Sequence, residues 1–119
     1  MSRDPWRLKV FVMADELAID VYRATAKFPI EEKYGLRAQL RRAAVSAPTN
    51  LVEGCARRTL RDYLYFINIS TSSASETRYL LGLSHRLGFI DEASLIERYT
   101  ELIRGLQALH ESLEPHPEV

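Results

Sequence analysis

The sequence has little of the material from which several classes of protein are built. Cys55 is the single cysteine among 119 residues, so no disulfide can form within the chain, and a disulfide-stapled secreted module is excluded. Five glycines and five prolines are few for a turn-rich β-protein. The apolar run at residues 10–14 is too short for a signal sequence or a membrane span. We therefore expect a cytoplasmic protein.

Charge is balanced overall but unevenly distributed. Residues 33–61 contain seven basic residues and one acidic residue, whereas residues 91–119 contain two basic and seven acidic residues. Two interpretations follow from this separation. Basic and acidic helices neutralise each other within the fold or between subunits, or the basic segment is the footprint of a nucleic acid.

Apolar residues recur at spacings of three and four, which places them on one face of a helix. The pattern predicts a single all-α domain over residues 1–114, followed by a frayed tail at 115–119. Helices are expected at about 6–27, 31–57, 59–87 and 91–113. In the last of these, the two spacings alternate as in the seam of a four-helix bundle, at Leu95, Tyr99, Leu102, Leu106, Leu109 and Leu113.

Residues at the breaks support these limits. Pro29 should stop the first helix, because the residue before proline is pushed out of the α region. Thr59 and Asp62 resemble a capping box at the start of the third helix. Gly88 suits a left-handed stop at its end, and Asp91 suits the N-cap of the fourth.

Pro48 lies inside the second helix and removes one of its backbone hydrogen bonds. We expect a kink there, because the amphipathic spacing continues across the proline. The alternative is a break, with Ser46 as the N-cap of a new helix.

Patterns of catalytic or metal-binding residues are missing. A di-iron bundle needs Glu-x-x-His on two helices, and the sequence contains none. His85, His110 and His116 have no ligand spacing to one another or to Cys55. The small hydroxyl residues at 70–75 favour close helix packing over an active site. We therefore predict a protein that is not an enzyme and that has no catalytic residue, metal, cofactor or small-molecule substrate.

A cluster of arginines and tyrosines is the best candidate for ligand binding. Arginine and lysine neutralise phosphates, and tyrosine stacks on unpaired bases, so the mixture is typical of an RNA-binding surface. The candidate residues are Lys33, Arg37, Arg41, Arg57, Arg58, Arg61, Tyr63 and Tyr65.

The second helix also carries a polar stripe beside its apolar one. A second long polar stripe often contacts another subunit or a ligand. Its members, again spaced by three and four, are Gln39, Arg42, Ser46, Asn50 and Glu53.

Three stretches, Glu32–Leu36, Gln39–Ser46 and Pro48–Gly54, give the chain a strong resemblance to a family of small bacterial four-helix-bundle proteins. These are the proteins encoded in intervening sequences of large-subunit ribosomal RNA genes, together with the accessory variability determinants of diversity-generating retroelements. Further matches are Phe28-Pro29, Ser73 with Glu76, and residues 87–90. The sequence departs from the family in having Ser72 where glycine is usual, and its neutral charge balance differs from that of the strongly basic retroelement members.

The resemblance implies an antiparallel up-down bundle that assembles into a ring-like homopentamer. It also implies that Arg42, Asn50, Glu53 and Glu76 form hydrogen bonds between helices or between subunits, in a polar network that includes Ser73.

Two functions are consistent with these observations. The first is a non-enzymatic, self-assembling bundle that serves as an RNA or ribonucleoprotein accessory scaffold, with RNA or a nucleic-acid enzyme such as a reverse transcriptase as its partner. The alternative is an oligomeric protein-interaction module that binds no nucleic acid. A salt-dependent affinity for RNA would distinguish them.

Overall fold

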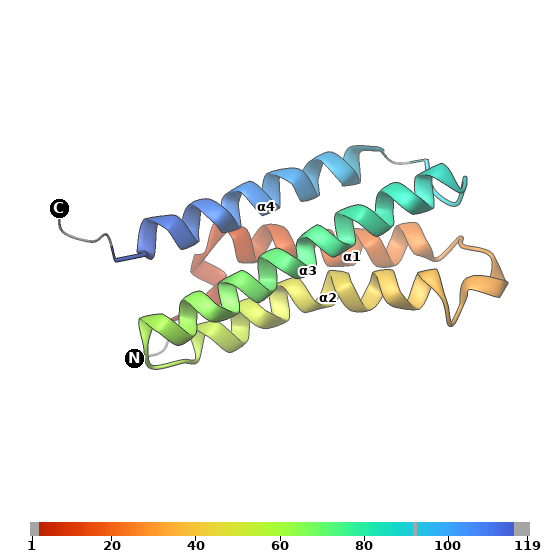
Figure 1. Cartoon of the computed structure of the whole chain (residues 1–119). Coiled ribbons are helices and arrows are strands. Elements are labelled where there is room, and N and C mark those ends of the chain that lie inside the picture. Colours follow the sequence, from red (N-terminus) through yellow and green to blue (C-terminus); the bar gives the residue numbers. More distant parts are fainter. Residues whose placement is uncertain (1–2, 92, 116–119) are drawn as a thin grey trace.

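The computed structural model describes residues 3–91 and 93–115, and within these ranges it contains helices and no strand. The all-α class and the number of long helices agree with the sequence. The long helices are α1 (Lys9–Thr25), α2 (Leu36–Cys55), α3 (Leu60–Arg86) and α4 (Ala93–Leu113), with short 3-10 turns at η1 (Pro5–Arg7) and η2 (Ile30–Glu32) (Figure 1). Of the tail expected to fray, residues 116–119 lie outside the described residues.

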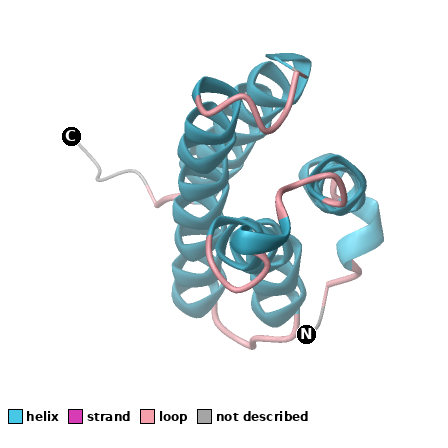
Figure 2. Cartoon of the chain, turned by 90° about the vertical axis from the view of Figure 1, so that its right-hand side faces the viewer, coloured by secondary structure: helices cyan, strands magenta, loops and turns pink. Residues whose placement is uncertain are grey.

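Successive helices run in opposite directions along one elongated bundle (Figures 1 and 2). α1 packs on α2 and α4, and α3 packs on the same two helices. Among the described residues no Cα atoms of α2 and α4 lie within 8 Å of each other, so the two helices lie across the bundle from one another. In the same part of the chain, every helix is too short or too polar to span a membrane.

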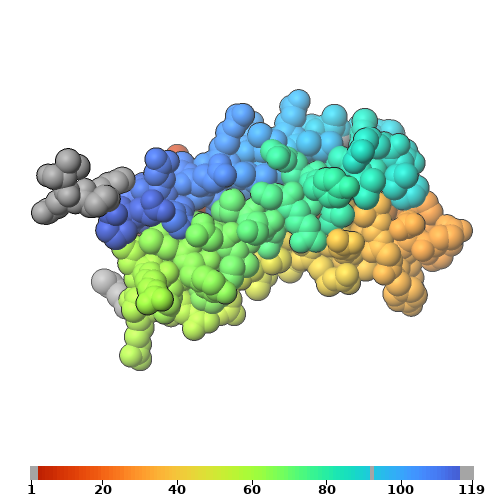
Figure 3. Space-filling model, in the orientation of Figure 1, coloured from red at the N-terminus to blue at the C-terminus, as the bar shows by residue number. Residues whose placement is uncertain are grey.

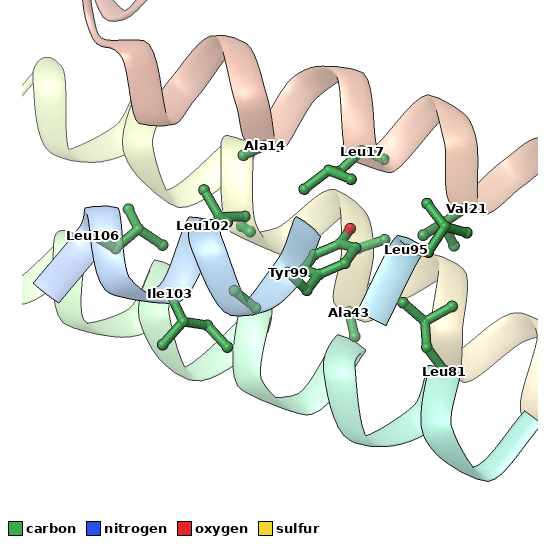
Figure 4. Close-up of a cluster of buried hydrophobic side chains, with 14 of the residues drawn as sticks. Ala14, Leu17, Val21, Ala43, Leu81, Leu95, Tyr99, Leu102, Ile103 and Leu106 are labelled. Carbon is green, nitrogen blue, oxygen red and sulfur yellow. The ribbon is translucent and has the colours of Figure 1, made fainter. Parts of the chain in front are cut away.

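Apolar side chains from all four helices meet along the bundle axis. Figure 4 shows Leu17 of α1 facing Tyr99 and Leu102 of α4, with Ala43 of α2 and Leu81 of α3 closing the cluster. The first four positions of the seam predicted for the last helix are buried, whereas Leu109 and Leu113 are half-buried. The spacing of three and four therefore identified the core face of α4.

Small side chains line the contact between α2 and α3. Ala43, Ala44 and Ala47 of α2 are buried, and so are Ser70 and Ala74 of α3. The Ser70 hydroxyl donates a hydrogen bond to the Ala47 carbonyl oxygen at 2.8 Å. The serine-rich stretch thus serves close helix packing, as its size predicted.

The helices begin slightly later than the sequence indicated. The Asp4 carboxylate accepts a hydrogen bond from the backbone N–H of Trp6 at 3.0 Å and so caps the turn η1, which delays α1 to Lys9. The Glu32 carboxylate accepts from the N–H of Leu36 at 3.0 Å, and Gly35 adopts a non-helical φ of −104° and ψ of −116°. The second helix therefore begins at Leu36 rather than near residue 31.

Three expectations concern Pro48 and the ends of α3. α2 is continuous through Pro48, so the alternative of a break capped by Ser46 is wrong. The Thr59 hydroxyl accepts from the N–H of Asp62 at 3.1 Å, as the capping pattern predicted. Gly88 has φ of +78°, and the N–H of Phe89 reaches back to the Ser84 carbonyl, which together form a left-handed helix stop.

Tyr99 is fully buried, and no described residue forms a hydrogen bond with its hydroxyl. Burial raises the pKa of this phenol. A buried polar group without a partner destabilises the folded state. We therefore expect Tyr99→Phe to raise the free energy of unfolding by about 1 kcal/mol, measured by urea denaturation. A loss of stability in this variant would show that the hydroxyl has a partner in solution.

Candidate functional site

A groove of about 660 Å³ opens on the surface between the end of α1, the segment after η2 and residues 37–50 of α2. Four of the side chains that line it are cationic and two are aromatic, and none of its lining residues is acidic. We call this surface the basic groove and define it by Tyr22, Lys33, Tyr34, Arg37, Arg41 and Arg42, together with the polar residues Ser46, Thr49 and Asn50.

Arg41 is held within the fold. Its Nε donates to the Thr25 hydroxyl oxygen at 2.8 Å, and its Nη2 donates to the Tyr22 carbonyl at 3.0 Å. The guanidinium also lies 4.5 Å from the centre of the Tyr22 ring. These contacts satisfy a carbonyl near the end of α1, where cations are favoured. Although the sequence suggested a ligand contact, Arg41 primarily ties α1 to α2.

The other cations of the groove are open to a ligand. Among the described residues, no salt bridge involves Lys33, Arg37 or Arg42. The Lys33 amine lies 5.4 Å from the centre of the Tyr34 ring, and Tyr34 is 87% exposed. These residues combine positive charge with an accessible aromatic face.

Arg57, Arg58 and Arg61 lie at the opposite end of α2 from Lys33. The twenty residues of α2 span about 30 Å at the rise of an α-helix. In Figure 3 the two ends of α2, coloured orange and yellow-green, lie at opposite ends of the molecule. The basic segment of the sequence therefore forms two separate surfaces within one subunit.

Of the three arginines at this second surface, Arg57 contacts other side chains of the protein, whereas the other two are exposed. Arg57 lies 3.5 Å from the Glu53 carboxylate and 4.7 Å from the centre of the Phe66 ring. Arg58 and Arg61 are exposed. Tyr65 is also exposed, and its ring packs edge-on against Phe66.

Tyr63 was wrongly placed among the RNA-binding candidates. It is only 2% exposed, and the Arg3 guanidinium lies 4.0 Å from the centre of its ring. A base has no access to either face of a ring that is buried in this way. The spacing of Tyr63, Phe66 and Ile67 already placed this tyrosine on the core face of the helix.

The acidic fourth helix does not cover the basic groove. α4 packs on α1 and α3, its described Cα atoms lie more than 8 Å from those of α2, and none of the residues that line the groove belongs to α4. Its arginine Arg98 instead forms a salt bridge with Asp20 of α1 at 2.7 Å. In the described residues no salt bridge joins α2 to α4, so direct pairing of the two helices within one subunit, one form of the first interpretation of the charge separation, is not observed.

The polar stripe of α2 faces α3. Hydroxyl oxygens of Ser46 and Ser73 lie 2.8 Å apart, and the Asn50 amide donates to the carbonyl and hydroxyl oxygens of Ser46 at 2.8 and 2.9 Å. Gln39 donates to the Glu76 carboxylate at 3.5 Å. The structure thus brings five of the seven network candidates together between the two helices.

The remaining two members of the proposed network, Glu53 and Arg42, form no hydrogen bond with α3 among the described residues. Glu53 pairs with Arg57 along its own helix rather than across to α3. Arg42 borders both the basic groove and a shallow pocket of about 410 Å³ that also includes Gln39, Ser73 and Glu76. Arg42 is therefore the member of the polar stripe that has a cationic side chain in the lining of the basic groove.

Sequence reasoning missed the two tyrosines of the groove. Tyr22 has the helical spacing of the apolar residues Ala18 and Val21, which favours the core face, but it is 45% exposed. Tyr34 lies between charged residues and Gly35, a context that predicts exposure. Its position beside the cations of α2 depends on how the segment after η2 folds back, which periodicity alone does not reveal.

In the part of the chain that the structure describes, the remaining histidines, the cysteine and the acidic residues are not gathered into a metal site. Within residues 3–91 and 93–115, no three histidine, cysteine or acidic side chains lie close enough to hold a metal. Burial raises the pKa of the Cys55 thiol, which disfavours the reactive thiolate. The His110 imidazole lies 2.9 Å from the Glu114 carboxylate at the end of α4, and His116 lies outside the described residues.

Comparisons with known proteins agree with this architecture. A crystal structure of a protein of unknown function from the S23 ribosomal protein family of Bacteroides thetaiotaomicron has the same fold, with a TM-score of 0.78. The two chains are 24% identical, and the match covers 86% of this chain and 95% of that one. No curated protein matches the sequence. Because the model of the 23S rRNA-intervening sequence protein family matches residues 7–110, the chain belongs to that family.

Proposed function

We propose that this protein is a non-enzymatic, self-associating helical bundle that acts in the cytoplasm as an RNA or ribonucleoprotein accessory scaffold. The observation on which the proposal rests is the basic groove, which presents Lys33, Arg37 and Arg42 without an acidic lining residue. A surface of this charge attracts phosphate through counterion release. The name of the family, which refers to 23S rRNA, makes RNA the natural ligand to test.

The polar stripe between α2 and α3 supports the self-association part of the proposal. Gln39 and Glu76 are exposed although they border a pocket of polar groups, and a second subunit that covers these two side chains would supply further hydrogen-bond partners. A ring-like homopentamer would repeat the basic groove around its axis. Light scattering on a sizing column gives the mass directly, and a monomer at micromolar concentration would refute the assembly.

RNA binding is tested by titrating a labelled, structured RNA at several salt concentrations. If the three unpaired cations of the groove each neutralise one phosphate, the logarithm of affinity should fall with the logarithm of salt with a slope of about −2 to −3 per subunit. Arg37→Ala should reduce that slope by about one and weaken binding to every RNA sequence alike.

A matched control for this experiment is Arg78→Ala. Arg78 is an exposed arginine of α3 outside the groove, and its Nη1 donates to the Thr100 hydroxyl at 3.4 Å. Equal losses from Arg37→Ala and Arg78→Ala would mean that binding follows overall charge and not the groove. Arg58→Ala tests the second basic surface in the same way.

The alternative function is an oligomeric protein-interaction module with no affinity for nucleic acid, or one that reaches RNA only through a protein such as a reverse transcriptase. The Ser46–Ser73 and Gln39–Glu76 contacts favour it, because they are placed to order an interface without any ligand. Absence of RNA binding at low salt, combined with a stable oligomer, would establish this alternative and reject the first function.

A further inference from the structure

We propose that the basic groove binds single-stranded RNA, with an unstacked base on Tyr34 and the neighbouring phosphates on Lys33 and Arg37; this inference rests on the proposed function and specifies its ligand. A charged surface alone would accept any polyanion. The groove adds aromatic rings to that charge, and the arrangement of the rings selects among the forms of RNA.

Tyr34 is the first residue of the groove that favours single-stranded RNA over other polyanions. Its side chain is 87% exposed, which is far from the burial expected of an aromatic residue that contributes to the core. The Lys33 amine lies 5.4 Å from its ring centre, so a cation and a stacking surface occupy adjacent positions. A nucleotide is complementary to this pair, because its phosphate is negatively charged and its base can stack on an aromatic ring.

Tyr22 and Arg41 form a second, more rigid surface that also lines the groove. The Arg41 guanidinium lies 4.5 Å from the Tyr22 ring centre and is fixed by its hydrogen bonds to Thr25 and to the Tyr22 carbonyl. These hydrogen bonds are made within the fold, so they hold the planar surface in a fixed position. Preorganised groups lose less conformational entropy on binding.

Polar groups of the groove complement a nucleoside. The Thr49 hydroxyl donates to the Val45 carbonyl at 2.7 Å, and the Asn50 amide nitrogen donates to Ser46. With these donors engaged, the oxygens of Thr49 and Asn50 serve as acceptors. Ribose hydroxyls and the exocyclic amines of bases are the donors that such acceptors would bind.

An RNA duplex fits these features poorly. Its bases are stacked within the helix, so only its phosphates and ribose edges would meet the groove. Single strands expose the faces of their bases, and stacking on an aromatic side chain adds affinity without much dependence on sequence. Two tyrosines in the lining of one basic groove, Tyr22 from α1 and Tyr34 from the segment after η2, therefore favour the single strand.

The test compares a labelled ten-nucleotide uridine RNA with a labelled RNA duplex by fluorescence anisotropy, using the full chain in its native assembly. Single-stranded RNA should bind at least about tenfold more tightly. Tyr34→Ala should weaken its binding about fivefold to a hundredfold and leave the affinity for the duplex unchanged. This loss should persist at high salt, whereas the loss from Arg37→Ala should shrink as salt rises.

Two variants serve as matched controls. Tyr34→Phe keeps the ring and should retain affinity, and Tyr79→Ala removes another exposed tyrosine, on α3 outside the groove, and should have no effect. Equal losses from Tyr34→Ala and Tyr79→Ala would overturn the assignment of the stacking site.

The outcomes distinguish binding of single-stranded RNA at Tyr34 from RNA binding in general. If the duplex binds as tightly as the single strand, or Tyr34→Ala binds normally, the single-strand inference fails while RNA binding stands. If neither RNA binds at low salt, both fail. Binding of poly-glutamate but of neither RNA would overturn the inference in favour of an acidic protein partner.

Discussion

Replacing Leu102 with alanine is expected to lower the free energy of unfolding by about 3 kcal/mol. Leu102 is 0% exposed, and in Figure 4 its side chain points from α4 towards Ala14 and Leu17 of α1. The shorter side chain would leave a cavity between the two helices, because neighbours in a packed core relax only partly. Urea denaturation followed by circular dichroism measures the loss.

Leu87→Ala is the control for this prediction. Leu87 is 54% exposed at the end of α3, so its truncation should cost less than about 1 kcal/mol. Both variants should be compared at one protein concentration, because self-association would add to the apparent stability. Similar losses in the two variants would mean that Leu102 does not face the core.

The bundle was predictable from the sequence because helix periodicity is a local property. The positions of Leu95, Tyr99 and Leu102 follow from their spacing alone, since each helix must bury one face. The start of α2 was not predictable in this way. It depends on the backbone conformation of Gly35 and on the Glu32 side chain, which caps a helix that the apolar pattern would begin earlier.

The candidate site was only partly predictable because charge in a sequence does not reveal its partners. Arg37 and Arg41 are one turn apart on α2, yet Arg41 donates hydrogen bonds to α1 whereas Arg37 makes no salt bridge among the described residues. The difference arises from the packing of α1 against α2. Long-range contacts of this kind decide which cations remain available to a ligand.

The relative placement of α2 and α4 was a further property that the sequence left open. Opposite charges on the two helices were compatible with direct neutralisation within the subunit. In an up-down bundle, however, helices two apart in the chain lie diagonally, and in the described residues no Cα atoms of α2 and α4 come within 8 Å of each other. Within these residues no salt bridge joins the cations of α2 to the acidic residues of α4.

Replacing Gly54 with alanine is expected to lower the free energy of unfolding by about 1 to 2 kcal/mol, although alanine is the better helix former. A Cβ atom at Gly54 of α2 would lie 2.9 Å from the Cβ of Phe66 and 3.3 Å from the Tyr63 ring of α3. The Phe66 Cβ is attached directly to the backbone of α3, so relief of the overlap requires the two helices to separate. That separation would also loosen the small-residue contact further along the pair.

Gly82→Ala is the matched substitution, because Gly82 is also helical but a Cβ there would have no other atom within 4 Å. Without a steric cost, the gain in helix propensity should raise the free energy of unfolding by up to about 1 kcal/mol. The two glycine variants should therefore shift thermal unfolding in opposite directions. A stabilised Gly54→Ala variant would contradict the close approach of α2 and α3, on which the Ser46–Ser73 contact and the polar stripe depend.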